Sequence, residues 1–230
     1  LTETELINLR RTIYLTIMSS SSYEECVHKL LQINIPLGYE NELCMMMIEC
    51  CANEKSYQSY YGLMGVRFCT INGNSNSKSN NKSKSNSRPY QEAFVKAFIN
   101  QYETIHRLET NKLRNIAKFF SYLLSQDSIP WGNCFKCIKL SLNDTTSSSR
   151  IFIKILIQDL CELLGYNVLY QRFNDDIMLS SGCYDGIFPK ENPSNIRFSI
   201  NFFTSIGLGG FSDKMREYLK NAPKLLEQQM

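Results

Sequence analysis

Residues 90–124 read YQEAFVKAFINQYETIHRLETNKLRNIAKFFSYLL, and this stretch decides the fold class. Its apolar residues recur at intervals of three and four, which is the spacing of one face of an α-helix. They are Phe94, Phe98, Tyr102, Ile105, Leu113, Ile116, Phe120, Leu123 and Leu124. The polar run between the two apolar groups predicts a break near Glu109 or Thr110. We therefore expect two amphipathic helices joined by a short corner.

The same spacing recurs along most of the 230 residues. It predicts further helices through 6–17, 22–31, 43–51, 57–69, 131–140, 150–164, 168–173 and 198–206, and a last one from Ser212-Asp213 that ends before Pro223. The segment 151–157 is rich in β-branched residues, but its length and the following Gly165 favour a buried helix over a strand. The expected fold is all-α: a HEAT-like helical-repeat solenoid of antiparallel helix pairs, with about ten to twelve helices.

Polar residues at the expected helix starts support these boundaries. The predicted caps are Thr2 with Glu5, Ser22 with Glu25, the serine run 147–149, and Asn192-Pro193. Serine, threonine and asparagine are favoured at such positions because their side chains accept hydrogen bonds from the first free amides of the helix.

Residues 72–89 (NGNSNSKSNNKSKSNSRP) differ from the rest of the chain in composition. They contain no side chain that could anchor them in an apolar core, so we expect a disordered surface loop. A tether that binds phosphate groups is the alternative. The expected organisation is a single helical domain over residues 1–230, with a low-complexity insertion loop at 72–89.

The net charge of +3 depends on that insertion. It holds Lys78, Lys82, Lys84 and Arg88 and no acid, so removing these four positive charges leaves −1 for the remainder. Affinity for nucleic acid comes mostly from lysine and arginine side chains that neutralise phosphates. The composition therefore does not predict an RNA-binding protein, although a local basic face stays open.

The nine cysteines are irregularly spaced, and most lie within the apolar helical patterns. Reduced cysteine behaves as a small buried hydrophobe, so we expect free thiols and a reducing intracellular compartment. The first twenty residues lack the pattern of a signal peptide, and no apolar run reaches the length of about eighteen residues that would span a membrane.

Three groups of residues could be mistaken for reactive sites. Cys134-Phe-Lys-Cys137 is the only CxxC pair and lacks the second pair of a structural zinc site, since the chain has just two histidines. The glycine-rich segment 206–212 lacks the lysine and serine of a phosphate loop, and its glycines favour a helix stop. His106 with Glu109 and His28 with Glu24-Glu25 show no sign of a pocket. We expect no catalytic residue, no metal site and no cofactor.

The polar run Arg107–Arg114 (RLETNKLR) is the strongest candidate for a binding surface. It places Arg107, Glu109, Asn111, Lys112 and Arg114 around the expected corner between two helices. Corners of helical repeats are frequent partner surfaces. The alternative is a solvated helix cap with local ion pairs, which would contribute little to stability.

Several longer motifs resemble the MA-3 domain of the splicing-factor family called Cwc-twenty-two, or nucampholin. They are NLRRTIYLTI at 8–17, SYEECVHKLL at 22–31, QYETIHRLETNKLRNIAK at 101–118, TSSSRIFIK at 146–154 and RFSINFFTSIGLGG at 197–210. The resemblance runs from about Leu6 to Pro223, and only the insertion and the segment 177–189 depart from the pattern. Arg150 and Arg197 lie in two of these motifs and join the corner residues as expected partner contacts.

The resemblance implies a HEAT-like solenoid without catalytic activity that docks on core proteins of the spliceosome in the nucleus. It also implies a link to deposition of the exon junction complex, whose DEAD-box helicase is engaged by a separate helical domain upstream in this family. MA-3 domains elsewhere bind such helicases. A helicase-binding regulator outside splicing is therefore one alternative, and a weak RNA-binding module using the insertion with Arg107, Lys112 and Arg114 is another.

Overall fold

The computed structural model describes residues 1–71 and 88–228, with side chains described up to residue 222. Within these ranges the chain is all-α, with twelve α-helices, two short 3-10 helices and no strand. The predicted helical class is therefore confirmed. The chain divides into two compact units, Leu1–Ile129 and Pro130–Met230.

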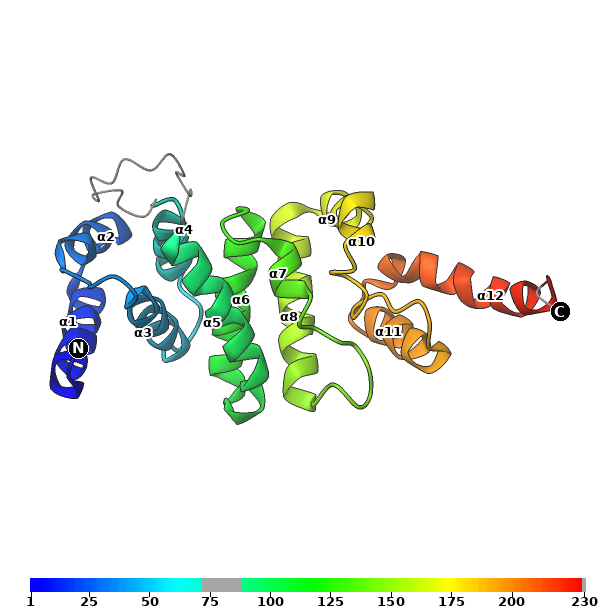
Figure 1. Ribbon diagram of the computed structural model, residues 1–230, viewed down its shortest axis with the longest axis horizontal. Helices are drawn as coiled ribbons and strands as arrows, with labels where there is room; N and C mark the ends of the chain where they lie inside the picture. Colours follow the sequence, from blue (N-terminus) through cyan, green and yellow to red (C-terminus); the bar gives the residue numbers. More distant parts are fainter. Residues whose placement is uncertain (72–87, 229–230) are drawn as a thin grey trace, which may run out of the picture. The chain divides into compact units, whose positions relative to one another are not determined.

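The first unit is a stack of helix pairs (Figure 1). Its elements are α1 (Glu3–Ser19), α2 (Tyr23–Gln32), α3 (Glu40–Ala52), α4 (Ser59–Cys69), α5 (Pro89–Glu103), the 3-10 helix η1 (Ile105–Arg107) and α6 (Thr110–Ser125). Helix α1 packs on α3 and α2 packs on α4, while α3 and α4 each contact both α5 and α6. Each pair therefore packs on the next pair, as expected for a helical repeat.

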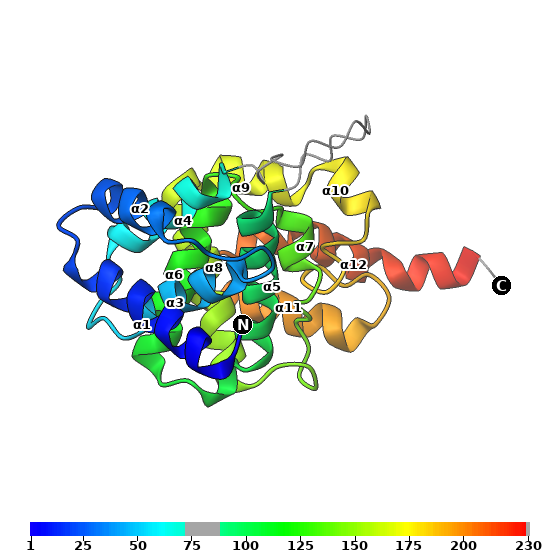
Figure 2. The ribbon, with the colours of Figure 1, turned by 60° about the vertical axis from the view of Figure 1, so that its left-hand side comes forward.

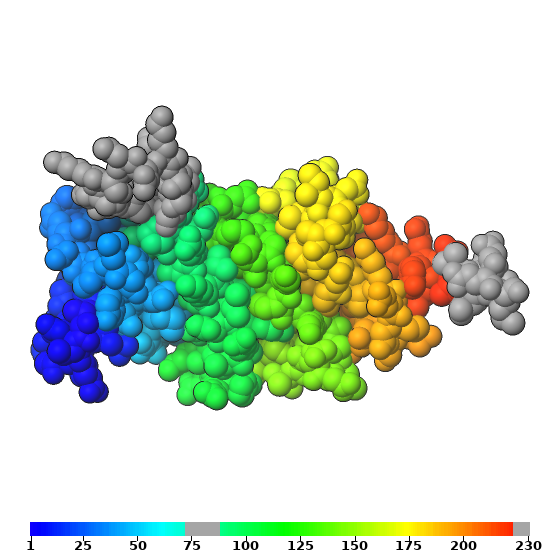
Figure 3. Space-filling view, in the orientation of Figure 1, coloured from blue at the N-terminus to red at the C-terminus, as the bar shows by residue number. Residues whose placement is uncertain are grey.

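The centre of the first unit is filled by phenylalanine rings from the opening stretch. Phe94, Phe98, Phe119 and Phe120 are fully buried. The ring centroids of Phe98 and Phe120 lie 5.1 Å apart at an interplanar angle of 88°, an edge-to-face arrangement that adds to the area-dependent stabilisation. The space between the ribbons of α5 and α6 is occupied by side chains in the space-filling view (Figure 3).

The second unit contains shorter helices and longer connections (Figure 2). Its elements are α7 (Trp131–Phe135), α8 (Ser147–Leu164), α9 (Tyr166–Phe173), α10 (Asp176–Ser180), α11 (Pro193–Ser205), the 3-10 helix η2 (Gly209–Ser212) and α12 (Asp213–Gln228). Phe173 is 1% exposed and packs edge-to-face on Phe135, Tyr184 and Phe211. An aromatic cluster around this ring therefore holds the unit together.

Most predicted helix caps are confirmed. Thr2 and Glu5 form a complete capping box, and Asn192 accepts hydrogen bonds from the amides of Ser194 and Asn195. Ser22 accepts from the amide of Glu25, but the Glu25 carboxylate instead accepts from Ser21 and Lys29.

The predicted cap of α8 is wrong. Its N-cap is Thr146, and Ser147–Ser149 form the first turn, with Ser149 completing the capping box. Threonine serves as an N-cap as serine does, and α8 therefore begins at Ser147, three residues before the predicted start at Arg150.

Two further boundaries differ from the prediction. Helix α12 does not end before Pro223 but continues to Gln228. A proline removes a single backbone donor, so the remaining hydrogen bonds can carry a helix past it. Helix α7 is shorter than the predicted 131–140, because Leu140 leaves the helical pattern and donates its amide to the main-chain oxygen of Gly186 at 2.8 Å.

The insertion predicted at 72–89 lies outside the described residues except for its last two positions. Arg88 is the N-cap of α5, and Pro89 occupies the first turn, where a missing amide donor costs nothing. The single domain over 1–230 stays a prediction, which a measurement of unfolding cooperativity across the two units would test.

Candidate functional site

The corner between α5 and α6 is a short, ordered connection. Helix α5 ends at Glu103, and the hydroxyl of its C-cap Thr104 donates to the main-chain oxygen of Asn100 at 2.9 Å. The 3-10 turn η1 follows, and Leu108 is extended before Glu109 begins α6 as its N-cap. Ile105 is 1% exposed, so the turn is anchored in the core. The predicted break at Glu109 or Thr110 is confirmed.

The polar side chains of this corner are free. Arg107, Glu109, Asn111 and Arg114 are exposed, and Lys112 is half-buried. Among the described residues, none of these five side chains has a hydrogen-bond or ion-pair partner. We call these five residues the corner surface. Its charges do not neutralise one another locally, so they remain available to a partner.

A buried asparagine fixes the helix that presents the corner surface. Asn115 is 1% exposed, and its side-chain amide donates to the main-chain oxygens of Cys51, Ala52 and Glu54 at 3.2, 3.4 and 2.8 Å. These oxygens lie in and just after the last turn of α3, where main-chain oxygens run short of helical donors. Sequence reasoning missed this residue, although a lone asparagine within the apolar pattern was a usable signal.

The two remaining predicted contacts lie in the second unit. Arg150 is half-buried in the first turns of α8 and donates from Nη1 to the hydroxyl of Thr145 at 3.2 Å. Arg197 is exposed on α11. The predicted set therefore consists of one cluster of five residues on the first unit and two separate arginines on the second.

The residues considered for reactive chemistry have structural surroundings. Cys134 is fully buried, and the Cys137 thiol donates to its main-chain oxygen at 3.1 Å. The ring of His28 lies 3.1 Å from the Gln32 amide at the surface. In the described part of the chain, no group of three or more histidine, cysteine or acidic residues could hold a metal ion. Gly207 adopts φ of 80°, in keeping with the predicted helix stop.

A second exposed feature is an apolar row on α1. Ile7, Tyr14, Leu15 and Met18 are 55%, 44%, 52% and 52% exposed. Their spacing puts them on one face of the helix, whereas Ile13 and Ile17 are buried on another. Contiguous exposed apolar side chains are typical of interaction surfaces. None of the helices in the described ranges is both long enough and apolar enough to cross a membrane.

Comparison with known proteins adds a family and several relatives. The model of the MA3 domain family matches residues 9–130. The pre-mRNA-splicing factor CWC22 homolog of Drosophila melanogaster is 52% identical over 223 residues, which cover 97% of this chain and 15% of that protein. CWC22 of Mycosarcoma maydis is 51% identical, and the CWC22 homolog of Homo sapiens is 48% identical; each match covers 98% of this chain and 23% of the relative. The chain thus spans less than a quarter of the length of these relatives.

Proposed function

The chain belongs to the MA3 domain family and is similar over almost its whole length to one stretch of pre-mRNA-splicing factor CWC22, and on that premise we propose that it is a non-catalytic docking scaffold in pre-mRNA splicing. Its partners are core proteins of the spliceosome, and its place of action is the nucleus. Within the longer protein, the scaffold contributes to deposition of the exon junction complex, while the DEAD-box helicase is engaged by a different, upstream domain.

The observation that carries this proposal is the state of the corner surface. Arg107 and Glu109 lie on an ordered turn and Arg114 in the first turns of α6, and all three are exposed without partners on the described chain. The backbone that presents these unpaired charges is already ordered, so a surface of complementary charge can bind without first ordering this segment.

Charge reversal at the corner surface tests the proposal. The double variant Arg107→Glu/Arg114→Glu should lose spliceosomal core proteins when the tagged chain is incubated with nuclear extract at moderate salt and bound proteins are identified by mass spectrometry. The matched control is Lys55→Glu/Arg67→Glu, which makes the same change in charge at two exposed positions of the first unit. The control should retain the same proteins as the wild type.

Each outcome has a defined meaning. Equal recovery with both variants would show that the corner surface is not the docking site. Recovery of a DEAD-box helicase or translation factors without spliceosomal proteins would favour a helicase regulator outside splicing. Direct binding to RNA would appear as an affinity that falls steeply with salt and depends on residues 72–89.

A further inference from the structure

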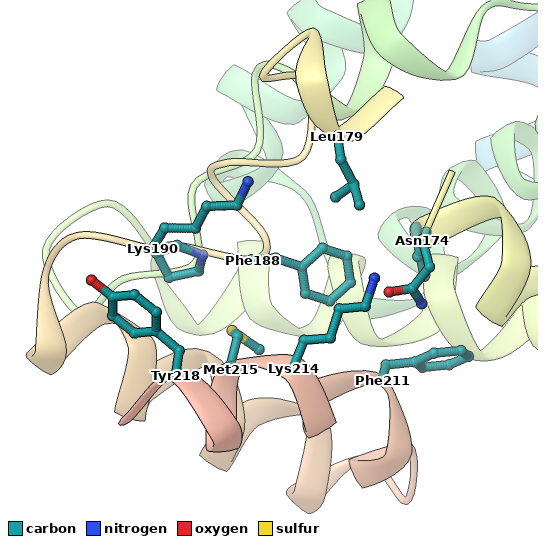
Figure 4. A pocket seen from close by; sticks show the side chains of 10 residues that line it. Asn174, Leu179, Phe188, Lys190, Phe211, Lys214, Met215 and Tyr218 are labelled. Carbon is teal, nitrogen blue, oxygen red and sulfur yellow. The ribbon is translucent and has the colours of Figure 1, made fainter. Parts of the chain in front are cut away.

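The second unit contains an apolar pocket that the corner surface does not involve (Figure 4). Its volume is about 300 Å³. It is lined by the end of α9, by α10, by the connection before α11, by η2 and by the first turns of α12. The lining residues are Phe173, Asn174, Leu179, Phe188, Pro189, Lys190, Phe211, Lys214, Met215 and Tyr218. The size lies at the lower end of ligand pockets, which suits a side-chain anchor rather than a large cofactor.

The floor of the pocket is part of the aromatic core. Phe173 and Phe211 are 1% and 5% exposed, and their ring centroids lie 5.5 Å apart at 90°. Phe188 stacks on Phe203 with centroids 5.3 Å apart and an interplanar angle of 11°. These rings are held by one another, so the pocket does not depend on a partner for its shape. Preformed apolar concavities of this kind are where anchor residues bind.

The charge at the pocket is of one sign. Lys190 and Lys214 are exposed, and Figure 4 shows their side chains on either side of Phe188. No acidic side chain lines the pocket, and neither lysine forms an ion pair with any described residue. The side-chain amide of Asn174 donates to the main-chain oxygen of Tyr170 at 2.8 Å, and its Oδ1 makes no hydrogen bond within the described chain. This oxygen can accept from the backbone amide of a bound peptide.

We propose that this pocket binds an acidic peptide segment of a partner protein, which inserts one bulky apolar side chain and places carboxylates beside Lys190 and Lys214. The apolar floor accounts for the anchor, and the two unpaired ammonium groups account for the flanking charge.

A nucleic acid is the less favoured occupant. Single-stranded nucleic acid binds where exposed aromatic faces can stack on bases. Here one face of Phe188 is covered by Phe203, and Phe173 and Phe211 are nearly completely buried. The pocket therefore offers a concave apolar surface, with Tyr218 as its one substantially exposed ring, at 42%.

The experiment uses Met215, which lines the pocket, as a reporter. The chain is labelled with ¹³C at its methionine methyl groups, and the Met215 resonance is followed by NMR. The probe is the peptide acetyl-Glu-Asp-Phe-Asp-Glu-amide. Two matched peptides replace the central phenylalanine by alanine, or the four acids by lysines. The first probe should shift the Met215 resonance saturably, and each matched peptide should bind at least about tenfold more weakly.

Variants distinguish peptide binding at the pocket from general electrostatic attraction between peptide and protein. Lys190→Glu/Lys214→Glu should weaken binding of the acidic peptide by at least about tenfold. Lys220→Glu changes an exposed lysine on α12 that does not line the pocket and should leave binding within about twofold of wild type. These exposed positions can be changed without disturbing the core, so the methyl spectrum of the free variants should stay native.

Four results would overturn the proposal. They are the absence of a saturable shift at millimolar peptide, equal binding of the peptide with central alanine, equal binding by the double lysine variant, and a stronger response to hexauridine RNA than to the acidic peptide. The corner surface is intact in all these variants, so the outcome is independent of the proposed docking function.

Discussion

The side-chain amide of Asn115 donates a hydrogen bond of 2.8 Å to the main-chain oxygen of Glu54, 61 residues away in the sequence. Two further oxygens, those of Cys51 and Ala52, share the same nitrogen at longer distances. Asn115, on α6, therefore supplies a hydrogen-bond donor to main-chain oxygens at the end of α3. It joins two neighbouring helix pairs by a polar contact that apolar packing could not replace, because buried carbonyl groups need donors.

We predict that Asn115→Ala lowers the free energy of unfolding by about 1–3 kcal/mol, since it removes the side-chain donor to the main-chain oxygens of Ala52 and Glu54. Denaturant unfolding followed by circular dichroism would measure the change. Asn111→Ala is the matched control, because Asn111 is exposed on the same helix and its side chain has no described partner. It should change stability by no more than about 0.5 kcal/mol. Equal effects of the two variants would contradict the role assigned to Asn115.

Phe120→Ala should destabilise the chain by about 3–5 kcal/mol, the usual range for a buried phenylalanine. Phe120 is fully buried, and its ring contacts those of Phe98 and Phe119. Truncation removes these contacts and leaves a cavity between α5 and α6. The measurement is the midpoint and slope of denaturant unfolding. A loss below about 1 kcal/mol would mean that the surrounding rings collapse into the space.

At Gly65, helices α4 and α6 pack too closely to leave room for a side chain. A Cβ atom there would lie 2.9 Å from Leu123 Cδ2 and 3.1 Å from Phe119 Cζ, so Gly65→Ala should destabilise by about 1–3 kcal/mol despite the better helix propensity of alanine. Gly132 is also helical, but a Cβ there would meet nothing closer than 3.7 Å. Gly132→Ala should therefore be neutral or stabilise by up to about 1 kcal/mol. Thermal unfolding of both variants distinguishes steric from propensity effects, and a destabilised Gly132→Ala would contradict this explanation.

The sequence predicted those features of the fold that depend on local periodicity. The three-and-four spacing located both helices of the opening stretch, and the break at Glu109 was right because polar residues interrupt the apolar face there. The boundary at Pro223 was wrong, since a single local rule about proline ignored the hydrogen bonds on either side of it.

Local periodicity could not predict contacts between residues that are far apart in the sequence. The corner surface could be located because its residues all lie within the eight positions from Arg107 to Arg114, around a predicted helix break. The pocket draws on segments from Phe173 to Tyr218, and no periodicity shows that these segments meet. The contact of Asn115 with Glu54 was equally inaccessible, because a helical pattern specifies which face is buried but not what it is buried against.

The cysteines give a prediction that depends on pH. Burial raises the pKa of Cys50 to about 11 and that of Cys69 to about 12, and seven of the nine thiols are buried. The thiolate is the reactive form, so a raised pKa lowers the reactive fraction at any pH below it. At pH 8 the native chain should react quickly with a thiol reagent only at Cys137 and Cys161, which are partly exposed.

The measurement is the stoichiometry of the fast phase with a chromogenic disulfide reagent, in native buffer and in denaturant. Two thiols should react in the fast phase, and this phase should disappear in Cys137→Ser/Cys161→Ser. In denaturant all nine thiols should react. Raising the pH should accelerate the slow phase, because the thiolate fraction of Cys50 increases with pH up to and beyond its pKa of about 11. A fast phase of more than two thiols at pH 8 would mean that a buried thiol is reached through local opening of its helix. A count of seven thiols in denaturant would mean that two cysteines are joined by a disulfide, contrary to the nine free thiols of the structure.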